Sequence, residues 1–155
     1  MITAELSAVI DRPIEDVFAF VGDQTNTPRW QSGLLEVRRT SDGPIGVGTT
    51  HTLVRTFMRR RMEADNEYVA YEPNKRIAFR TTSGPVRLEA SYLFEPSAAG
   101  TRLTSRIEMD ASGLVSLAEP LIAAGLKREM KAAFRVLKSL LEDQTFAIAT
   151  RPATP

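Results

Sequence analysis

The feature that most constrains this chain is a change in the spacing of its apolar residues, from period two to the helical period near the carboxyl end. Residues 2–11 alternate, and their apolar face holds Ile2, Ala4, Leu6, Ala8 and Ile10. Six further strand-like runs cover residues 34–41, 48–58, 61–71, 75–83, 86–95 and 101–110. Period two is typical of a half-buried strand, so the sequence predicts seven strands.

The connections between these runs are short and rich in turn residues. They hold Ser41-Asp42-Gly43-Pro44, Arg59–Arg61, Glu72-Pro73-Asn74, Ser83-Gly84-Pro85 and Pro96 to Gly100. Short connections between consecutive strands favour an antiparallel meander.

Three helical segments are predicted around the strands. Asp11 and Pro13 are expected to start a first short helix, which Gly22 ends. A second short helix or turn is expected within residues 23–33, with a start signal at Asn26-Thr27-Pro28. From about 115 to 143 the apolar stripe is Leu117, Leu121, Leu126, Met130, Phe134, Leu137 and Leu141. Such a helix is about 40 Å long and can cross a whole sheet. Pro120 fits it only in the first turn or at a kink.

Composition narrows the class of protein. The 155 residues suit one domain over 1–143, and the loss of pattern over 144–155 predicts a flexible tail. Twenty basic and 19 acidic side chains give a net charge of +1, which provides no general attraction to nucleic acid. The sequence lacks a run of about 20 apolar residues and a signal-peptide pattern. We therefore expect neither nucleic-acid binding nor stable membrane insertion. We expect a cytoplasmic location.

Residue counts also exclude several site chemistries. The sequence has no cysteine, so it has no disulfide and no thiolate nucleophile. Its one histidine, His51, leaves only scattered carboxylates as metal ligands. The glycines of residues 43–48 precede a strand rather than a helix, which indicates a turn and not a phosphate-binding loop. Neither a metal nor a cofactor is expected.

Several local motifs point to a known family. They are Ile10-Asp11-Arg12-Pro13-Ile14-Glu15-Asp16-Val17-Phe18, Asp23 to Trp30, Gly43-Pro44-Ile45-Gly46-Val47-Gly48-Thr49, Tyr71-Glu72-Pro73, Phe94-Glu95-Pro96 with Gly100-Thr101, and Leu140-Leu141-Glu142. With them, residues 2–143 resemble the polyketide cyclase/dehydrase-like branch of the SRPBCC (START/Bet v 1-like) superfamily. The resemblance implies an α+β helix-grip fold. In that fold a seven-stranded antiparallel sheet wraps around the long carboxy-terminal helix, with two short helices after the first strand and a cavity between sheet and helix.

Alternation assigns the side chains that face this cavity. On residues 50–57 it points His51, Leu53, Arg55 and Phe57 inward, and Thr50, Thr52, Val54 and Thr56 toward water. Tyr71 is placed on the outer face with Glu63, Asp65 and Glu67. The expected ligand-binding set is His51, Leu53, Arg55, Phe57, Asn66, Tyr68, Phe79, Tyr92, Ile107, Met130 and Phe134. This interior is mostly apolar with a few polar groups, as in ligand pockets.

The polar residues of this set have more than one interpretation. His51 is a candidate general acid or base, or a hydrogen-bonded histidine in the cavity wall. Arg55 contacts an anionic ligand, pairs with a carboxylate, or lies in water near the strand end. Tyr68 and Tyr92 are favoured as core aromatics whose hydroxyls find one partner. Trp30 is expected to anchor the second short helix, with a lid over the cavity as its alternative.

Three functions remain open at this point. The first is a carrier or sensor that binds a small hydrophobic molecule such as a lipid, a polyketide or an aromatic compound. The second is a cofactor-independent cyclase or dehydratase with His51 as acid or base, assisted by Tyr68 or Arg55. The third is an accessory domain that binds a protein partner through the sheet edge or the helix. A homodimer is also left open, and Arg59–Arg61 is expected to be a solvated hairpin tip.

Overall fold

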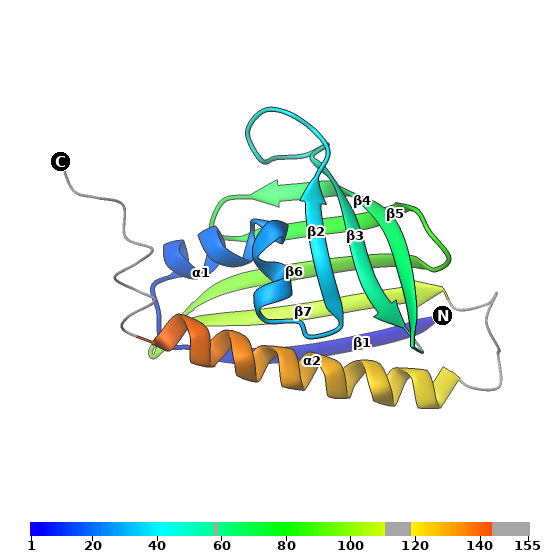
Figure 1. Ribbon diagram of the computed structural model, residues 1–155. Helices are drawn as coiled ribbons and strands as arrows, with labels where there is room; N and C mark the ends of the chain where they lie inside the picture. The colour runs from blue at the N-terminus through cyan, green and yellow to red at the C-terminus, as the bar shows by residue number, and fades with distance from the viewer. Residues whose placement is uncertain (58, 111–118, 144–155) are drawn as a thin grey trace.

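Seven antiparallel strands form one curved sheet, and a long helix runs along one side of it (Figure 1). The computed structural model describes residues 1–57, 59–110 and 119–143, except for the side chain of Phe57. The elements are β1 (Ile2–Ile10), α1 (Ile14–Val21), the 3₁₀ helix η1 (Gln24–Arg29), β2 (Leu34–Arg39), β3 (Thr50–Phe57), β4 (Arg60–Glu72), β5 (Arg76–Ser83), β6 (Arg87–Ser97), β7 (Gly100–Asp110) and α2 (Glu119–Glu142). The predicted order of strands and helices is confirmed.

The strand order is β1-β7-β6-β5-β4-β3-β2, so the first and last strands are neighbours. β1 pairs with β7 from Ile2 opposite Met109 to Ile10 opposite Thr101. From β2 to β7 each strand pairs with the next, which confirms the antiparallel meander. The two short helices occupy the connection that carries the chain from β1 to the opposite edge at β2.

Hydrogen bonds attach the carboxyl end of α2 to the start of the chain. Arg12 Nη1 donates to the carbonyl oxygen of Leu141 at 2.8 Å, and Lys138 Nζ donates to that of Val9 at 2.8 Å. The backbone N–H of Asp11 donates to Glu142 Oε1 at 2.9 Å. A helix end leaves carbonyl groups without intrahelical partners, and Arg12 satisfies one of them here. These contacts fix where α2 lies along β1.

The apolar core has two parts. The larger surrounds the carboxyl half of α2, where Phe134, Leu137 and Leu141 pack with residues of α1, β1, β5, β6 and β7. The smaller lies toward the amino half of α2 and centres on Ile2 and Met109.

Two predicted helix starts are corrected by the structure. Pro13, not Asp11, occupies the N-cap of α1, and no side chain caps that helix. η1 starts at Asp23, whose carboxylate accepts a hydrogen bond from the backbone N–H of Thr25 at 3.0 Å. Pro28 lies inside η1, so the predicted start at Asn26-Thr27-Pro28 is wrong. The predicted stop at Gly22 is confirmed, because its N–H bonds the carbonyl oxygen of Phe18.

The predicted outward direction of Tyr71 is wrong because of a β-bulge. The register between β4 and β5 shifts between Tyr68 and Ala70, so strict alternation fails there. After the bulge, Tyr71 lies opposite Ile77, a core residue, and its ring stacks on that of Tyr68 at 6.1 Å between centroids. Tyr71 therefore packs inward against the larger core cluster.

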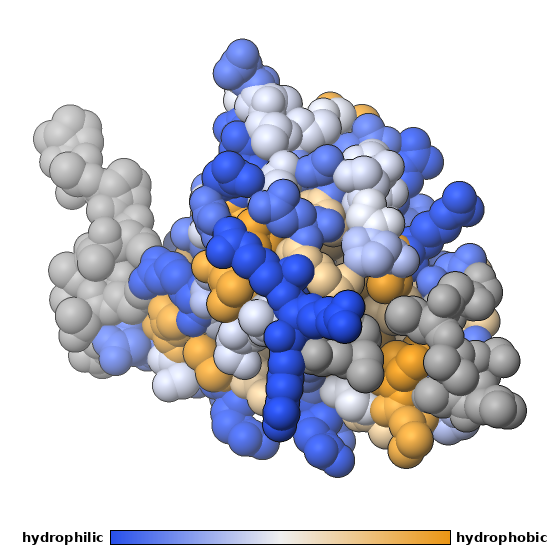
Figure 2. Space-filling model, turned by 45° about the vertical axis from the view of Figure 1, so that its right-hand side comes forward, coloured by the Kyte–Doolittle hydropathy of each residue, from blue (hydrophilic) through white to orange (hydrophobic). Residues whose placement is uncertain are grey.

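Two apolar side chains also differ from their predicted exposure. The helical stripe predicts a buried Leu121, yet this side chain is 78% exposed, and Figure 2 shows hydrophobic side chains at the surface where α2 begins. Ile122 packs instead, because it lies eight residues, or about two helical turns, before the buried Met130. Alternation predicts that Val54 faces water, yet it is 1% exposed. Its register partners on the neighbouring strands are Glu36 and Glu63.

Candidate functional site

A group of polar side chains lies on the inner sheet face where β3 and β4 meet the start of η1. His51 and Asn66 are opposite each other in the β3–β4 pair. Asn66 Nδ2 donates to Gln24 Oε1 at 2.9 Å, and the Tyr68 hydroxyl donates to the carbonyl oxygen of Gly22 at 2.6 Å. We call His51, Asn66, Gln24 and Tyr68 the polar cluster. Its hydrogen bonds connect the sheet to the turn between α1 and η1.

The backbone at Gly22 allows this connection. A Cβ atom there would lie 2.6 Å from the carbonyl oxygen of Phe18 and 3.1 Å from Ile77 Cδ1. Any larger residue would force α1 and the turn apart from β5. Glycine at this position therefore lets the turn approach the sheet closely enough for Tyr68 to reach it.

Several polar atoms of the cluster are buried without a protein partner. His51 is 0% exposed, and neither of its ring nitrogens hydrogen-bonds a described residue. The same holds for Asn66 Oδ1 and Gln24 Nε2. Buried polar atoms are nearly always hydrogen-bonded, because leaving one unpaired costs about 1–3 kcal/mol. The cluster therefore presents donors and acceptors that the protein itself does not use.

Burial also sets the protonation states in the cluster. It lowers the pKa of His51, while the nearby charge of Asp23 raises it and that of Arg39 lowers it. His51 is therefore neutral near neutral pH, with one nitrogen that donates and one that accepts. Burial raises the pKa of Tyr68 well above its usual range, so its hydroxyl stays protonated.

A series of aromatic rings continues from the cluster across the inner face to α2. Successive ring centroids are 5.5–6.4 Å apart along the order His51, Tyr68, Phe79, Tyr92, Trp30 and Phe134. We call the last five of these residues the aromatic band. Gln31 Nε2 donates to the Tyr92 hydroxyl at 3.3 Å, and Trp30 Nε1 is a further buried atom without a partner among the described residues. The buried position of Trp30 fits its predicted role as the anchor of η1.

Solvent still reaches part of this inner face. Leu53, Arg55, Phe79 and Ile107 all point inward by register, yet each is only half-buried. Their remaining exposure means that the described elements do not cover this part of the inner face completely. We call the solvent-accessible region beside these four residues the inner hollow; Phe79 joins it to the aromatic band, whose other four rings are buried in the larger core cluster.

The structure brings most of the predicted site residues together. His51, Asn66 and Tyr68 form the polar cluster, and Phe79, Tyr92 and Phe134 belong to the aromatic band. Leu53, Arg55 and Ile107 line the inner hollow, and Met130 is buried on the sheet-facing side of α2. The side chain of Phe57 lies outside the described residues, as do residues 111–118 with Leu117 and the predicted tail 144–155.

The sequence did not indicate two glutamines of the site. Gln24 begins η1 and Gln31 follows it, and their side chains reach residues 42 and 61 positions away in the chain. The one local signal near Gln24 is the helix cap at Asp23, which fixes Gln24 as the first residue of η1.

Other features of the described residues carry less chemistry. A surface pocket of about 250 Å³ lies between α1, η1 and the end of α2, but its Arg12 is already bound to Asp16 and to the Leu141 carbonyl. Within the described ranges, no group of three or more histidine or acidic side chains is arranged to hold a metal ion. No described helix is both long and apolar enough to cross a membrane.

Comparisons with known proteins agree with this architecture. Residues 1–142 match the family model described as polyketide cyclase/dehydrase and lipid transport. An uncharacterised protein of Mycobacterium tuberculosis is 29% identical over 125 residues, which cover 76% of this chain and 73% of that protein.

Solved structures share the fold at lower identity. An aromatase/cyclase from Streptomyces sp. R1128 superposes with a TM-score of 0.75 at 16% identity, over 94% of this chain and 96% of that one. A protein of Thermus thermophilus has a TM-score of 0.73 at 18% identity, over 97% and 99% of the two chains. At such identity the likeness establishes the helix-grip fold alone.

Proposed function

The chain belongs to the polyketide cyclase/dehydrase and lipid transport family, and from this premise we propose that it is a carrier or sensor of a small hydrophobic molecule bound in the inner hollow. A lipid, a polyketide or an aromatic compound fits this description. The observation that carries the proposal is the polar cluster, whose unused hydrogen-bonding atoms lie at one end of the aromatic band.

The chemistry of the lining supports a ligand with two different ends. Binding pockets are mostly apolar, with a few polar groups that fix orientation. The aromatic band offers ring faces and edges to an apolar or aromatic body. At the cluster, His51 and Gln24 Nε2 supply donors and Asn66 Oδ1 an acceptor. A hydroxyl or carbonyl group placed there would satisfy atoms that the protein leaves unpaired.

The test uses the one tryptophan of the sequence, Trp30, as a fluorescent reporter inside the aromatic band. Titration with 2-naphthol and with naphthalene compares two ligands that differ in a single hydroxyl. We expect both to quench Trp30, and 2-naphthol to bind about tenfold more tightly, because one buried hydrogen bond is worth about 1.4 kcal/mol. His51→Phe should remove this difference, whereas Thr56→Val, at an exposed site on the outer face of β3, should keep it.

Native mass spectrometry of protein purified from its own host provides an independent test of ligand binding. A co-purified hydrophobic molecule supports the proposal and names its ligand. If nothing co-purifies and neither naphthalene compound changes the fluorescence of Trp30, the carrier or sensor function is refuted.

An enzymatic role is the second candidate, a cofactor-independent cyclase or dehydratase with His51 as acid or base. The lowered pKa of His51 favours it, since a neutral imidazole beside the ligand can accept a proton. The comparison is His51→Ala, assayed for ligand affinity and for turnover of a polyketide-like substrate. If His51→Ala loses turnover but keeps its ligand affinity, the protein is an enzyme and the carrier function is rejected. If the unmodified protein shows no turnover, the enzymatic function is rejected.

We further propose that residues 1–143 form a single domain that folds without residues 144–155. The support is that the family match covers residues 1–142 and that the contacts of Arg12 and Lys138 hold the end of α2. A chain ending at Asp143 should melt within about 2 °C of the full chain, because the contacts that hold the end of α2 lie within residues 1–143. A larger decrease in melting temperature would mean that residues 144–155 belong to the domain.

The mass measured in the same native spectra decides whether the protein is a homodimer.

A further inference from the structure

Arg55 is a charged side chain on the inner sheet face that has no ionic partner among the described residues. It points into the inner hollow from β3 and is half-buried. None of the carboxylates that the structure describes forms an ion pair with it. The sequence left three interpretations of Arg55 open, and a carboxylate partner within the described part of the chain is thereby removed.

The strand neighbours of Arg55 are apolar. Leu34 of β2 and Met62 of β4 lie opposite it in the two strand pairs, and Leu53 shares its face of β3. By register, the acidic residues of the described strands all lie on the outer face, as do Glu36 and Glu63 beside Val54. A half-buried guanidinium with apolar neighbours loses part of its hydration and gains no compensating charge.

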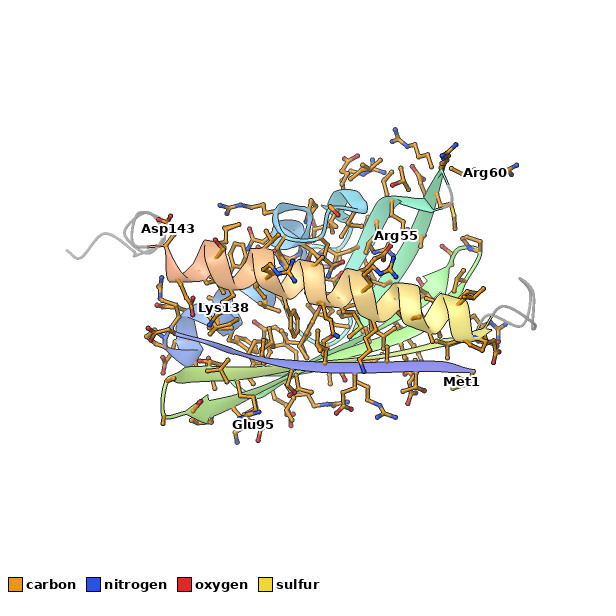
Figure 3. All side chains as sticks on the ribbon, turned by 90° about the horizontal axis from the view of Figure 1, so that it is seen from below. Met1, Arg55, Arg60, Glu95, Lys138 and Asp143 are labelled. Carbon is orange, nitrogen blue, oxygen red and sulfur yellow. The ribbon has the colours of Figure 1, made fainter. Side chains whose placement is uncertain are left out.

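The charge of Arg55 also acts on the Tyr92 hydroxyl. Burial raises the pKa of Tyr92 to about 12, and the positive charge of Arg55 opposes that rise. Tyr92 accepts a hydrogen bond from Gln31, so its own O–H remains free to donate. In the view from below, Arg55 lies between β3 and α2, while Arg60 projects from the hairpin tip at the edge of the molecule (Figure 3).

From this arrangement we propose that the bound molecule is a hydrophobic carboxylic acid whose carboxylate contacts the guanidinium of Arg55. The inference rests on the proposed function and specifies its ligand class. Arginine presents two parallel N–H groups that match the two oxygens of a carboxylate, and Tyr92 is placed to donate a further hydrogen bond. The apolar body of the acid lies along the aromatic band toward the polar cluster.

The experiment compares 2-naphthoic acid with 2-naphthamide, which has nearly the same shape but no charge. Both are titrated at neutral pH against the Trp30 fluorescence of the full chain. We expect the acid to bind at least about tenfold more tightly than the amide, as hydrogen bonds to charged groups exceed neutral ones by this order. Arg55→Gln should weaken the acid by about 10- to 100-fold and leave the amide nearly unchanged.

Two further variants complete the test. Arg55→Lys keeps the charge without the paired N–H groups, so the acid should bind with intermediate affinity. Arg60→Gln removes an equal charge at the exposed hairpin tip and should leave both affinities unchanged. Retained binding of the amide by Arg55→Gln shows that the variant is folded.

The outcomes separate this inference from the proposed function. Equal binding of acid and amide by the unmodified protein overturns the carboxylate assignment alone. An unchanged preference of Arg55→Gln for the acid overturns it as well. An equal loss of acid affinity in Arg60→Gln also overturns it, because that result would indicate general attraction by surface charge. Binding of neither compound overturns the inference together with the hydrophobic hollow on which it depends.

Discussion

Tyr68→Phe tests the hydrogen bond that joins the sheet to the turn before η1. The change removes one hydroxyl and keeps the ring, which contacts His51 and Phe79. Tyr68 is 1% exposed, and its hydroxyl donates to the Gly22 carbonyl at 2.6 Å. A buried hydrogen bond contributes about 1 kcal/mol, and an acceptor left unpaired adds to the loss, so we expect unfolding to become easier by about 1–2 kcal/mol.

Tyr71→Phe is the matched control for this prediction. Tyr71 stacks on Tyr68 and packs on the same core, but it is half-buried and its hydroxyl bonds no described residue. Its loss should change the free energy of unfolding by less than about 0.5 kcal/mol. The two variants therefore remove the same atom from neighbouring rings with different expected results.

Urea unfolding followed by Trp30 fluorescence, together with thermal melting by circular dichroism, measures the difference. For a chain of this size, about 1 kcal/mol corresponds to a shift in Tm of about 2–4 °C. Tyr68→Phe should thus melt about 2–8 °C below the unmodified protein, and Tyr71→Phe close to it. If the two variants unfold alike, the Tyr68–Gly22 bond does not hold the turn to the sheet and the reasoning fails.

Three further predictions concern pH and packing. Burial lowers the pKa of His51, so the unfolded chain binds a proton that the folded chain does not as pH falls below 6.5, and stability decreases there. His51→Gln should flatten urea unfolding midpoints between about pH 5 and 7, and an unaltered profile would contradict the buried histidine. Burial raises the pKa of Tyr92 to about 12 from its usual 10.0. As pH rises above 10.0, Tyr92 therefore loses its proton in the unfolded chain before it does so in the folded chain, and stability decreases. Each such tyrosine costs about 1.4 kcal/mol of stability per pH unit in this range, and Tyr92→Phe should reduce the measured slope; an equal slope would count against it. Leu137→Ala should destabilise the fold by about 2–5 kcal/mol in urea unfolding, whereas Leu121→Ala should have an effect below about 0.5 kcal/mol. Comparable losses would mean that Leu121 is packed after all.

Individual residues show how far local patterns carry. Alternation along β3 and β4 correctly turned His51, Asn66 and Tyr68 inward, because direction within a regular strand depends on the strand alone. The same rule failed at Tyr71, where the bulge adds one residue against β5. It also misjudged Val54, which is 1% exposed although alternation places it on the outer face.

By itself the amino-acid sequence determined the strands, the three helical segments and the family, because turn chemistry and hydrophobic period act over a few residues. The tertiary structure decided what the polar residues do. Gln24 meets Asn66 across 42 positions, and Gly22 meets Tyr68 across 46, contacts for which no local pattern exists. It likewise decided that Arg55 has no described carboxylate beside it, since ion pairing depends on which faces the whole sheet brings together. The inner hollow and its polar groups are thus products of long-range packing around elements that the sequence had already specified.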